Sequence, residues 1–76
     1  MNKGDFGLIG KWVFLYPSFF QAFVWGFEEG KIKAKVFFET CQGIKVRNRF
    51  LDVECVAGIV EGDNLRKVQE IFAPFI

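Results

Sequence analysis

The fold is decided by residues 19–50, which read FFQAFVWGFEEGKIKAKVFFETCQGIKVRNRF. Two short segments that end in glycine, Glu28-Glu29-Gly30 and Cys41-Gln42-Gly43, separate three runs rich in aromatic and β-branched residues. Three-residue hairpin loops favour glycine at their last position, because the left-handed conformation there is strained for a residue with a Cβ. The pattern therefore predicts two β-hairpins that share a middle strand, with strands at about 19–27, 31–40 and 44–50.

With these loops, the alternation of side chains along the three strands predicts a sheet with two different faces. The aliphatic face would hold Phe20, Ala22, Val24, Ile32, Ala34, Val36, Phe38, Ile44, Val46 and Phe50. The aromatic and basic face would hold Phe19, Phe23, Trp25, Phe27, Lys31, Lys33, Lys35, Phe37, Lys45, Arg47 and Arg49. A two-residue loop at either turn would place lysine and arginine among the aliphatic side chains, so we expect three-residue loops at both.

A further strand is expected before this stretch, at about 7–16, where Trp, Val, Phe and Tyr are concentrated as they are in strands. We interpret Pro17-Ser18 as the two-residue turn that connects it to the next strand. That register adds Ile9, Val13 and Leu15 to the aliphatic face, and Trp12, Phe14 and Tyr16 to the aromatic one. It also places Lys11 on the aliphatic side, where a lysine is tolerated only near an edge.

The residues after Phe50 carry a different pattern and predict two helices. Residues 51–60 alternate adequately as a strand, but a strand here would prolong the preceding one without a turn, and Asp52 is suited to cap a helix. We therefore expect a helix at about 53–61, against the strand preference of its β-branched residues.

Residues 64–73 have apolar side chains at helical spacing and end before Pro74, which predicts the second helix.

The expected architecture is an α+β single domain over residues 1–76, a four-stranded antiparallel meander with two short C-terminal helices packed on one face. The helices should lie on the aliphatic face, where the small side chains of Ala22 and Ala34 leave room. A chain of 76 residues is near the lower limit for a self-sufficient core, and 51% of its residues are hydrophobic. The surplus apolar surface predicts a homodimer or a bound partner.

Charge is distributed unevenly along the chain. The net charge is only +1, but residues 31–49 hold six cations against one carboxylate, which gives +5. Residues 1–30 sum to −1 and residues 50–76 to −3. A basic hairpin on a nearly neutral protein indicates a directed electrostatic surface rather than general affinity for polyanions.

The sequence offers little for catalysis or for crossing a membrane. It contains no histidine, no phosphate-binding glycine loop and no nucleophile beside a recognisable base, so we expect a non-enzymatic protein without metals or cofactors. Cys41 and Cys55 are either free thiols or one bridge, and so few cysteines favour a reducing, cytoplasmic setting. The uncharged run Trp12–Phe27 has sixteen residues, too few for a membrane-spanning helix, and Pro17-Ser18 interrupts it.

The aromatic and basic face is the best candidate for a binding site. Its candidate binding residues are Lys33, Lys35, Lys45, Arg47, Arg49, Phe23, Trp25, Phe27 and Phe37. On a single-stranded nucleic acid, the cations would neutralise phosphates and the rings would stack on bases. Two alternatives stay open: a protein-binding surface, for which aromatic and arginine side chains are typical anchors, and a second core layer or homodimer seam.

The run Lys31-Ile32-Lys33-Ala34-Lys35-Val36 is followed by a glycine-bearing turn, a basic strand and a helix. It resembles the central hairpin of a small phage anti-CRISPR family. That resemblance implies a four-stranded antiparallel sheet with helices that blocks the DNA-binding surface of a CRISPR complex, and hence a protein partner. The Trp- and Phe-rich first half of the chain departs from that family. The expected order of elements also resembles, by topology alone, dimeric single-stranded-DNA-binding coactivators.

Overall fold

The structure is a computed structural model that describes residues 7–18 and 20–76, so that the expected place of Phe19 lies outside the described residues. The strands are β1 (Trp12–Leu15), β2 (Gln21–Glu28), β3 (Lys31–Thr40), β4 (Gly43–Asp52) and β5 (Val56–Ile59). The 3₁₀ turn η1 (Val53–Cys55) separates β4 from β5. Helix α2 (Gly62–Phe72) and a second 3₁₀ turn, η2 (Ala73–Phe75), follow β5.

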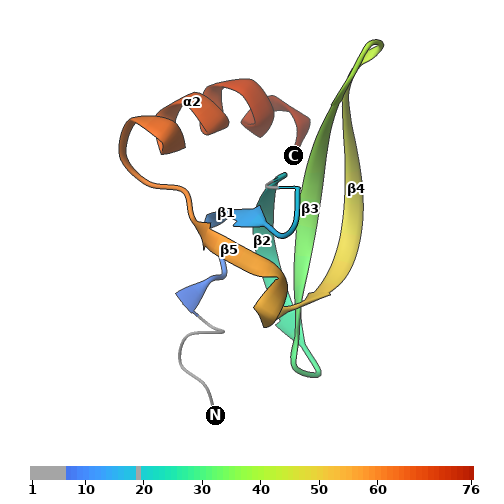
Figure 1. Cartoon of the computed structure of the whole chain (residues 1–76), viewed down its shortest axis with the longest axis vertical. Coiled ribbons are helices and arrows are strands. Elements are labelled where there is room, and N and C mark those ends of the chain that lie inside the picture. Colours follow the sequence, from blue (N-terminus) through green and yellow to red (C-terminus); the bar gives the residue numbers. More distant parts are fainter. Residues whose placement is uncertain (1–6, 19) are drawn as a thin grey trace.

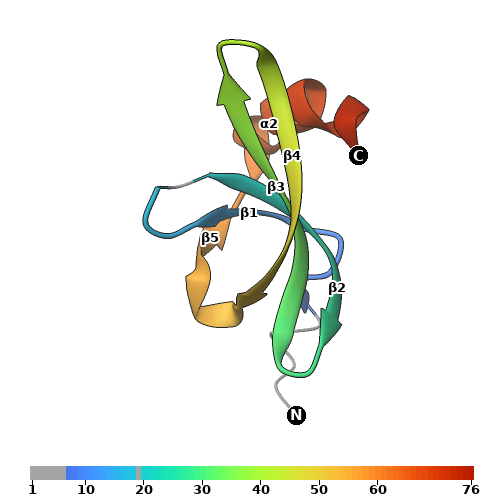
Figure 2. The same ribbon diagram turned by 90° about the vertical axis from the view of Figure 1, so that its right-hand side faces the viewer.

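The strands make one antiparallel sheet in the order β4-β3-β2-β1-β5, which curls into a half-barrel (Figure 1). The β3–β4 hairpin is longer than its neighbours and projects beyond the rest of the sheet, as Figure 2 shows. The α+β class and the antiparallel sheet are confirmed. The number of elements differs, because the described residues form five strands in place of four and one α-helix in place of two. The helix expected at 64–73 is present as α2 and begins slightly earlier.

The prediction of a helix at 53–61 is wrong. Only η1 is helical there, and β5 follows it, antiparallel to β1. The Tyr16 N–H donates to the Cys55 carbonyl oxygen at 2.8 Å, and the Val60 N–H donates to that of Trp12 at 2.9 Å. The open edge of β1 thus supplies backbone partners that a helix would forgo, and the β-branched residues of this segment suit a strand better.

The turn between β2 and β3 contains two residues, Glu29 and Gly30, in place of the three expected. Their φ angles are +52° and +78°, the left-handed pair that a two-residue type I′ turn requires. Gly30 adopts this conformation without strain, whereas the Cβ of Glu29 makes it unfavourable. The sequence pattern did not indicate this turn, because type I′ turns usually carry Asn or Asp before the glycine.

Replacing Glu29 with asparagine, which tolerates the left-handed conformation, is expected to raise the free energy of unfolding by about 0.5–1 kcal/mol. Chemical denaturation of the two proteins measures the difference. Glu39→Asn is the control, because Glu39 lies within β3 and asparagine is disfavoured in strands. A similar gain at both positions would show that the turn conformation is not the cause.

A β-bulge at Trp25 compensates for the shorter turn. Next to the turn Phe27 pairs with Ile32, but beyond the bulge Val24 pairs with Ala34, which is the register that a three-residue loop would produce. The predicted face is therefore right for Val24. It is wrong for Phe27, which packs against the aliphatic core.

The turn between β3 and β4 is also shorter than expected, with Cys41 and Gln42 between the paired residues Thr40 and Gly43. The Thr40 hydroxyl stabilises this turn, since it accepts a hydrogen bond from the Gln42 N–H at 3.2 Å and donates one to the Gly43 carbonyl oxygen at 2.7 Å. A change of one residue in register moves every side chain of β4 to the other face of the sheet.

The predicted faces of β4 are therefore reversed. Its three cations share the face of the aliphatic core, in the pairs Phe38–Lys45, Val36–Arg47 and Ala34–Arg49. Three apolar side chains share the face of Phe37 instead: Ile44, Val46 and Phe50. The cations are tolerated beside aliphatic residues because β4 lies at the edge of the sheet, where long side chains reach water.

The first hairpin agrees with the prediction in register, and β1 is shorter than expected. Val13 pairs with Ala22, as a Pro17-Ser18 turn requires. Ahead of the strand, Leu8 is buried in the aliphatic core, whereas Ile9, which was expected there, is 41% exposed. The β1–β2 register is set by a local turn signal, and this is why the sequence predicts it correctly.

The two faces of the sheet carry separate cores. The inner core, enclosed by the curl of the half-barrel, consists of Leu8, Val13, Leu15, Ala22, Val24, Ile32, Ala34 and Val36. The outer core, between the sheet and α2, consists of Trp12, Phe37, Val60, Val68 and Phe72. We name the two faces of the sheet inner and outer after these cores.

The expectation that helices cover the aliphatic face is wrong, because α2 packs on the outer, aromatic face (Figure 1). The ring of Phe37 lies 4.9 Å from that of Phe72 and 5.3 Å from that of Trp12, measured between centroids. Large rings bury more apolar area per residue than alanine and valine do, so the aromatic face benefits most from a covering helix.

Candidate nucleic-acid interface

A shallow hollow of about 560 Å³ lies on the inner face of the β3–β4 hairpin. It is lined by Phe38, Thr40, Lys45, Arg47 and Arg49. Residues two apart on a strand point to the same side, so the three cations form a row with a spacing of about 7 Å, twice the rise per residue. We call Lys45, Arg47 and Arg49 the basic row.

The basic row has no neutralising partner among the described residues. Its three side chains are exposed, and the ion pairs in the described part of the chain involve other lysines, Lys31 with Asp52 and Lys33 with Glu28. The electrostatic field of the row is therefore available to an anionic ligand.

An aromatic pair borders the basic row. Phe38, which pairs with Lys45 across the hairpin, meets Phe20 edge to face with ring centroids 4.8 Å apart. Phe20 is 41% exposed, and Phe38 is half-buried beneath it. Cations beside an exposed ring offer the two contacts that single-stranded nucleic acids use, namely phosphate neutralisation and base stacking.

A second exposed group lies on the outer face, towards the β2–β3 turn. Trp25, at the bulge, is 45% exposed and Phe50 is 65% exposed. The Lys33 ammonium lies 5.3 Å from the centroid of the Trp25 ring and 5.6 Å from that of Phe50. The same ammonium pairs with Glu28, so the group is neutral as a whole. We call Trp25, Lys33 and Phe50 the aromatic platform.

In the structure the predicted binding residues lie in different environments, so the prediction of a single aromatic and basic face is wrong. The basic row and the platform contain Lys45, Arg47, Arg49, Trp25 and Lys33. Phe37 is only 1% exposed and is not available to a base, and Phe23 is half-buried in the same outer core. Phe27 packs on the inner core. Lys35 is half-buried and pairs with Asn48 on the outer face.

Phe20, Phe38 and Thr40 belong to the inner site, although the sequence pattern did not place them there. The register between β3 and β4 determines whether they belong to the site, because a two-residue turn after Thr40 puts Phe38 opposite Lys45. Threonine at the start of a turn often bonds the backbone two residues further on. That local preference was the available sign of the shorter loop.

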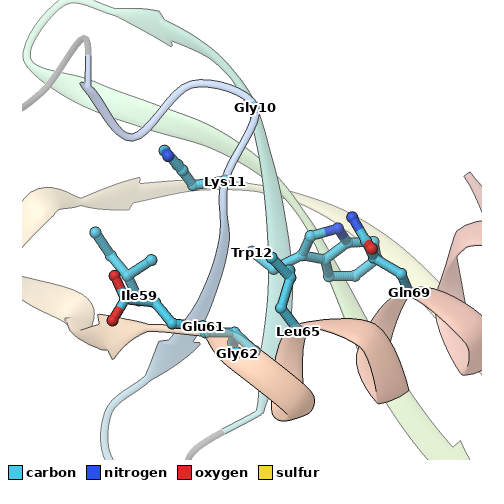
Figure 3. A pocket seen from close by; sticks show the side chains of 9 residues that line it. Gly10, Lys11, Trp12, Ile59, Glu61, Gly62, Leu65 and Gln69 are labelled. Carbon is cyan, nitrogen blue, oxygen red and sulfur yellow. The ribbon is translucent and has the colours of Figure 1, made fainter.

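A separate cavity of about 330 Å³ lies where β1, β5 and the start of α2 meet (Figure 3). Trp12 and Leu65 contribute apolar walls, with Lys11 and Glu61 on one side and Gln69 on the other. A cavity of this size can hold a small ligand non-covalently. Its lining residues include no hydroxyl or thiol, so it has no nucleophile of the serine or cysteine type.

Cys41 is exposed in the β3–β4 turn and Cys55 is half-buried in η1, both as free thiols. Within residues 7–18 and 20–76, no three His, Cys, Asp or Glu side chains lie together in a way that could hold a metal ion. No helix in that part of the chain combines the length and apolar character needed to cross a bilayer. The uncharged run 12–27 contributes to β1 and β2 instead.

No family model, curated protein or solved structure matches this chain. Neither resemblance noted from the sequence, to an anti-CRISPR hairpin or to DNA-binding coactivators, gains support from these comparisons. The function is therefore inferred from the basic row, its aromatic neighbours and the platform.

Proposed function

We propose that this protein binds single-stranded nucleic acid through the inner face of the β3–β4 hairpin. The observation that carries the proposal is the basic row, three exposed cations at alternate positions of one strand without carboxylate partners among the described residues. Their spacing is comparable to one nucleotide step of an extended strand, so each cation can meet a successive phosphate. The exposed ring of Phe20 offers a stacking surface beside them.

The distribution of acidic residues supports the same proposal. Glu61, Asp63 and Glu70 belong to α2 and its N-terminal boundary, and α2 lies on the face of the sheet opposite the basic row. At physiological salt, charges separated by more than about 8 Å are largely screened. These carboxylates therefore do little to repel a polyanion on the inner face. The activity is non-enzymatic, needs no cofactor and suits the cytoplasm, where both free thiols stay reduced.

Fluorescence anisotropy of labelled oligo-dT, measured over a series of salt concentrations, tests the proposal. Three phosphate contacts should give a linear fall of log K with log salt and a slope of about −2, since each contact to a single strand contributes about 0.7. Duplex DNA of the same length should bind more weakly, because its stacked bases cannot reach Phe20. Absence of binding at low salt, or a slope near zero, would contradict the proposal.

A protein partner is the second candidate, and the aromatic platform is the observation that favours it. Exposed tryptophan and phenylalanine are typical anchors of protein interfaces. Ile71, Phe75 and Ile76 add exposed apolar surface at the end of the chain. A homodimer, or an inhibitor of a nucleic-acid-binding complex, would use such surfaces. In that case the protein would not bind free oligonucleotides, and light scattering would detect a dimer or a defined complex.

A further inference from the structure

We infer that the bound strand straddles the β4 edge of the sheet, so that its phosphates contact the basic row on the inner face while its bases stack on the aromatic platform of the outer face. This inference rests on the proposed function. It adds Trp25 and Phe50, on the opposite face of the sheet, to the binding site.

The position of β4 makes both faces accessible to one ligand. β4 lies at the end of the strand order and has β3 as its neighbour in the described sheet. Successive side chains of a strand point to opposite faces, so Arg49 on the inner face is followed directly by Phe50 on the outer face. A strand of nucleic acid lying along this open edge reaches both side chains without crossing another β-strand.

The charges on the two faces differ in the way a nucleic-acid strand requires. The basic row is unpaired among the described residues, whereas two lysines of the outer face are neutralised: Lys33 of the platform pairs with Glu28, and Lys31 pairs with Asp52 at 3.0 Å. A neutral aromatic surface accepts stacked bases, and the carboxylates of these pairs disfavour phosphates there. The inner face therefore suits the backbone of the ligand and the outer face suits its bases.

The platform is held in place before any ligand arrives. The Lys33 ammonium makes cation–π contacts with the rings of both Trp25 and Phe50. Gly26 leaves room for the lysine side chain, because a Cβ at this position would lie 3.3 Å from Cδ of Lys33. The bulge displaces Trp25 from the regular ladder, and the residue is 45% exposed. Rings that are already ordered lose little freedom when a base stacks on them.

Affinity for labelled oligo-dT in matched variants tests the inference. Phe50→Ala and Trp25→Ala should each weaken binding about tenfold and leave the salt slope unchanged, because a lost stacking contact involves no phosphate. Ile59→Ala removes an apolar side chain from a residue that is 43% exposed on β5, at the edge of the sheet opposite β4, and should leave the affinity unchanged. Stacking should also quench the fluorescence of Trp25, and Trp25→Phe should abolish this quenching while retaining the affinity.

The outcomes separate the inference from the proposed function. If the unaltered protein binds oligo-dT with the expected salt slope, but shows no quenching and no loss in Phe50→Ala and Trp25→Ala, then the outer face is not part of the site. The proposed function would still stand in that case. A loss in Ile59→Ala equal to that in Phe50→Ala would overturn the inference as well. Absence of oligo-dT binding by the unaltered protein would overturn both.

Discussion

Phe37→Ala is expected to lower the free energy of unfolding by about 3–5 kcal/mol. The side chain is 1% exposed in the outer core. Its ring lies against those of Trp12 and Phe72, which belong to β1 and α2, so truncation leaves a cavity that three elements border. A chain of this length has a total stability on the order of 4–11 kcal/mol, so the loss is a large part of it. Denaturant titration followed by circular dichroism measures the change.

Phe50→Ala is the matched control for this prediction. It makes the same substitution on the same face of the neighbouring strand, but Phe50 is 65% exposed, so we expect a loss below about 1 kcal/mol. Equal destabilisation by the two variants would mean that Phe37 does not lie buried beneath α2. A small effect of Phe37→Ala on stability together with weaker oligo-dT binding would instead indicate that Phe37 contacts the ligand.

The parts of the fold that the sequence predicts correctly have strong local signals. β3 occupies the expected residues 31–40, because its alternating lysine and aliphatic residues fit a strand and no other element. Gly30 and Gly43 do adopt the expected positive φ, +78° and +114°, although Gly43 is the first residue of β4 and not part of the turn. The helix before Pro74 is also present, because its helical spacing and its stop signal agree.

Local signals decide the register of β4 only weakly, since two loops that differ by one residue are both compatible with a turn at Cys41-Gln42-Gly43 and the turn preference of Thr40 is the one local sign that favours the shorter loop. Tertiary packing decides between them. In the observed register Ile44 and Val46 point to the outer face and pack beside Phe37 in the core that α2 covers. The predicted register instead followed from keeping lysine and arginine apart from the aliphatic side chains, a criterion that does not hold for β4 because its cations reach water at the sheet edge.

The predicted site and the site in the structure differ for the same reason. The basic row contains three of the predicted cations, but the sequence placed them beside Phe37, whereas the structure places them beside Phe38. β5 was ambiguous in a similar way, since residues 53–61 fitted both a strand and a helix. What decided between them was the open edge of β1, which lies about forty residues earlier in the chain and cannot be recognised by a local pattern.

The triple variant Lys45→Gln, Arg47→Gln, Arg49→Gln is expected to weaken oligo-dT binding by about a hundredfold or more at low salt and to bring the salt slope close to zero. Each charge-assisted contact to a phosphate contributes about 1–2 kcal/mol, and three such contacts correspond to at least that loss. The slope should change by about 2, because the phosphate contacts that release counterions are gone. Anisotropy titrations at several salt concentrations measure both quantities. The three side chains are exposed, so we expect the fold to be retained.

The triple variant Lys11→Gln, Arg66→Gln, Lys67→Gln is the control, because it also removes three positive charges, but from exposed positions outside the hairpin. If the ligand contacts the basic row directly, this variant should bind much more tightly than the basic-row variant at the same salt concentration. At physiological salt, where charges more than about 8 Å apart are largely screened, it should bind within about threefold of the unaltered protein. Equal losses in the two triple variants would mean that oligo-dT responds to net charge alone, as it does in general polyanion attraction. That result would remove the basis for a defined site on the hairpin, whereas a loss confined to the basic row would locate the phosphate contacts on β4.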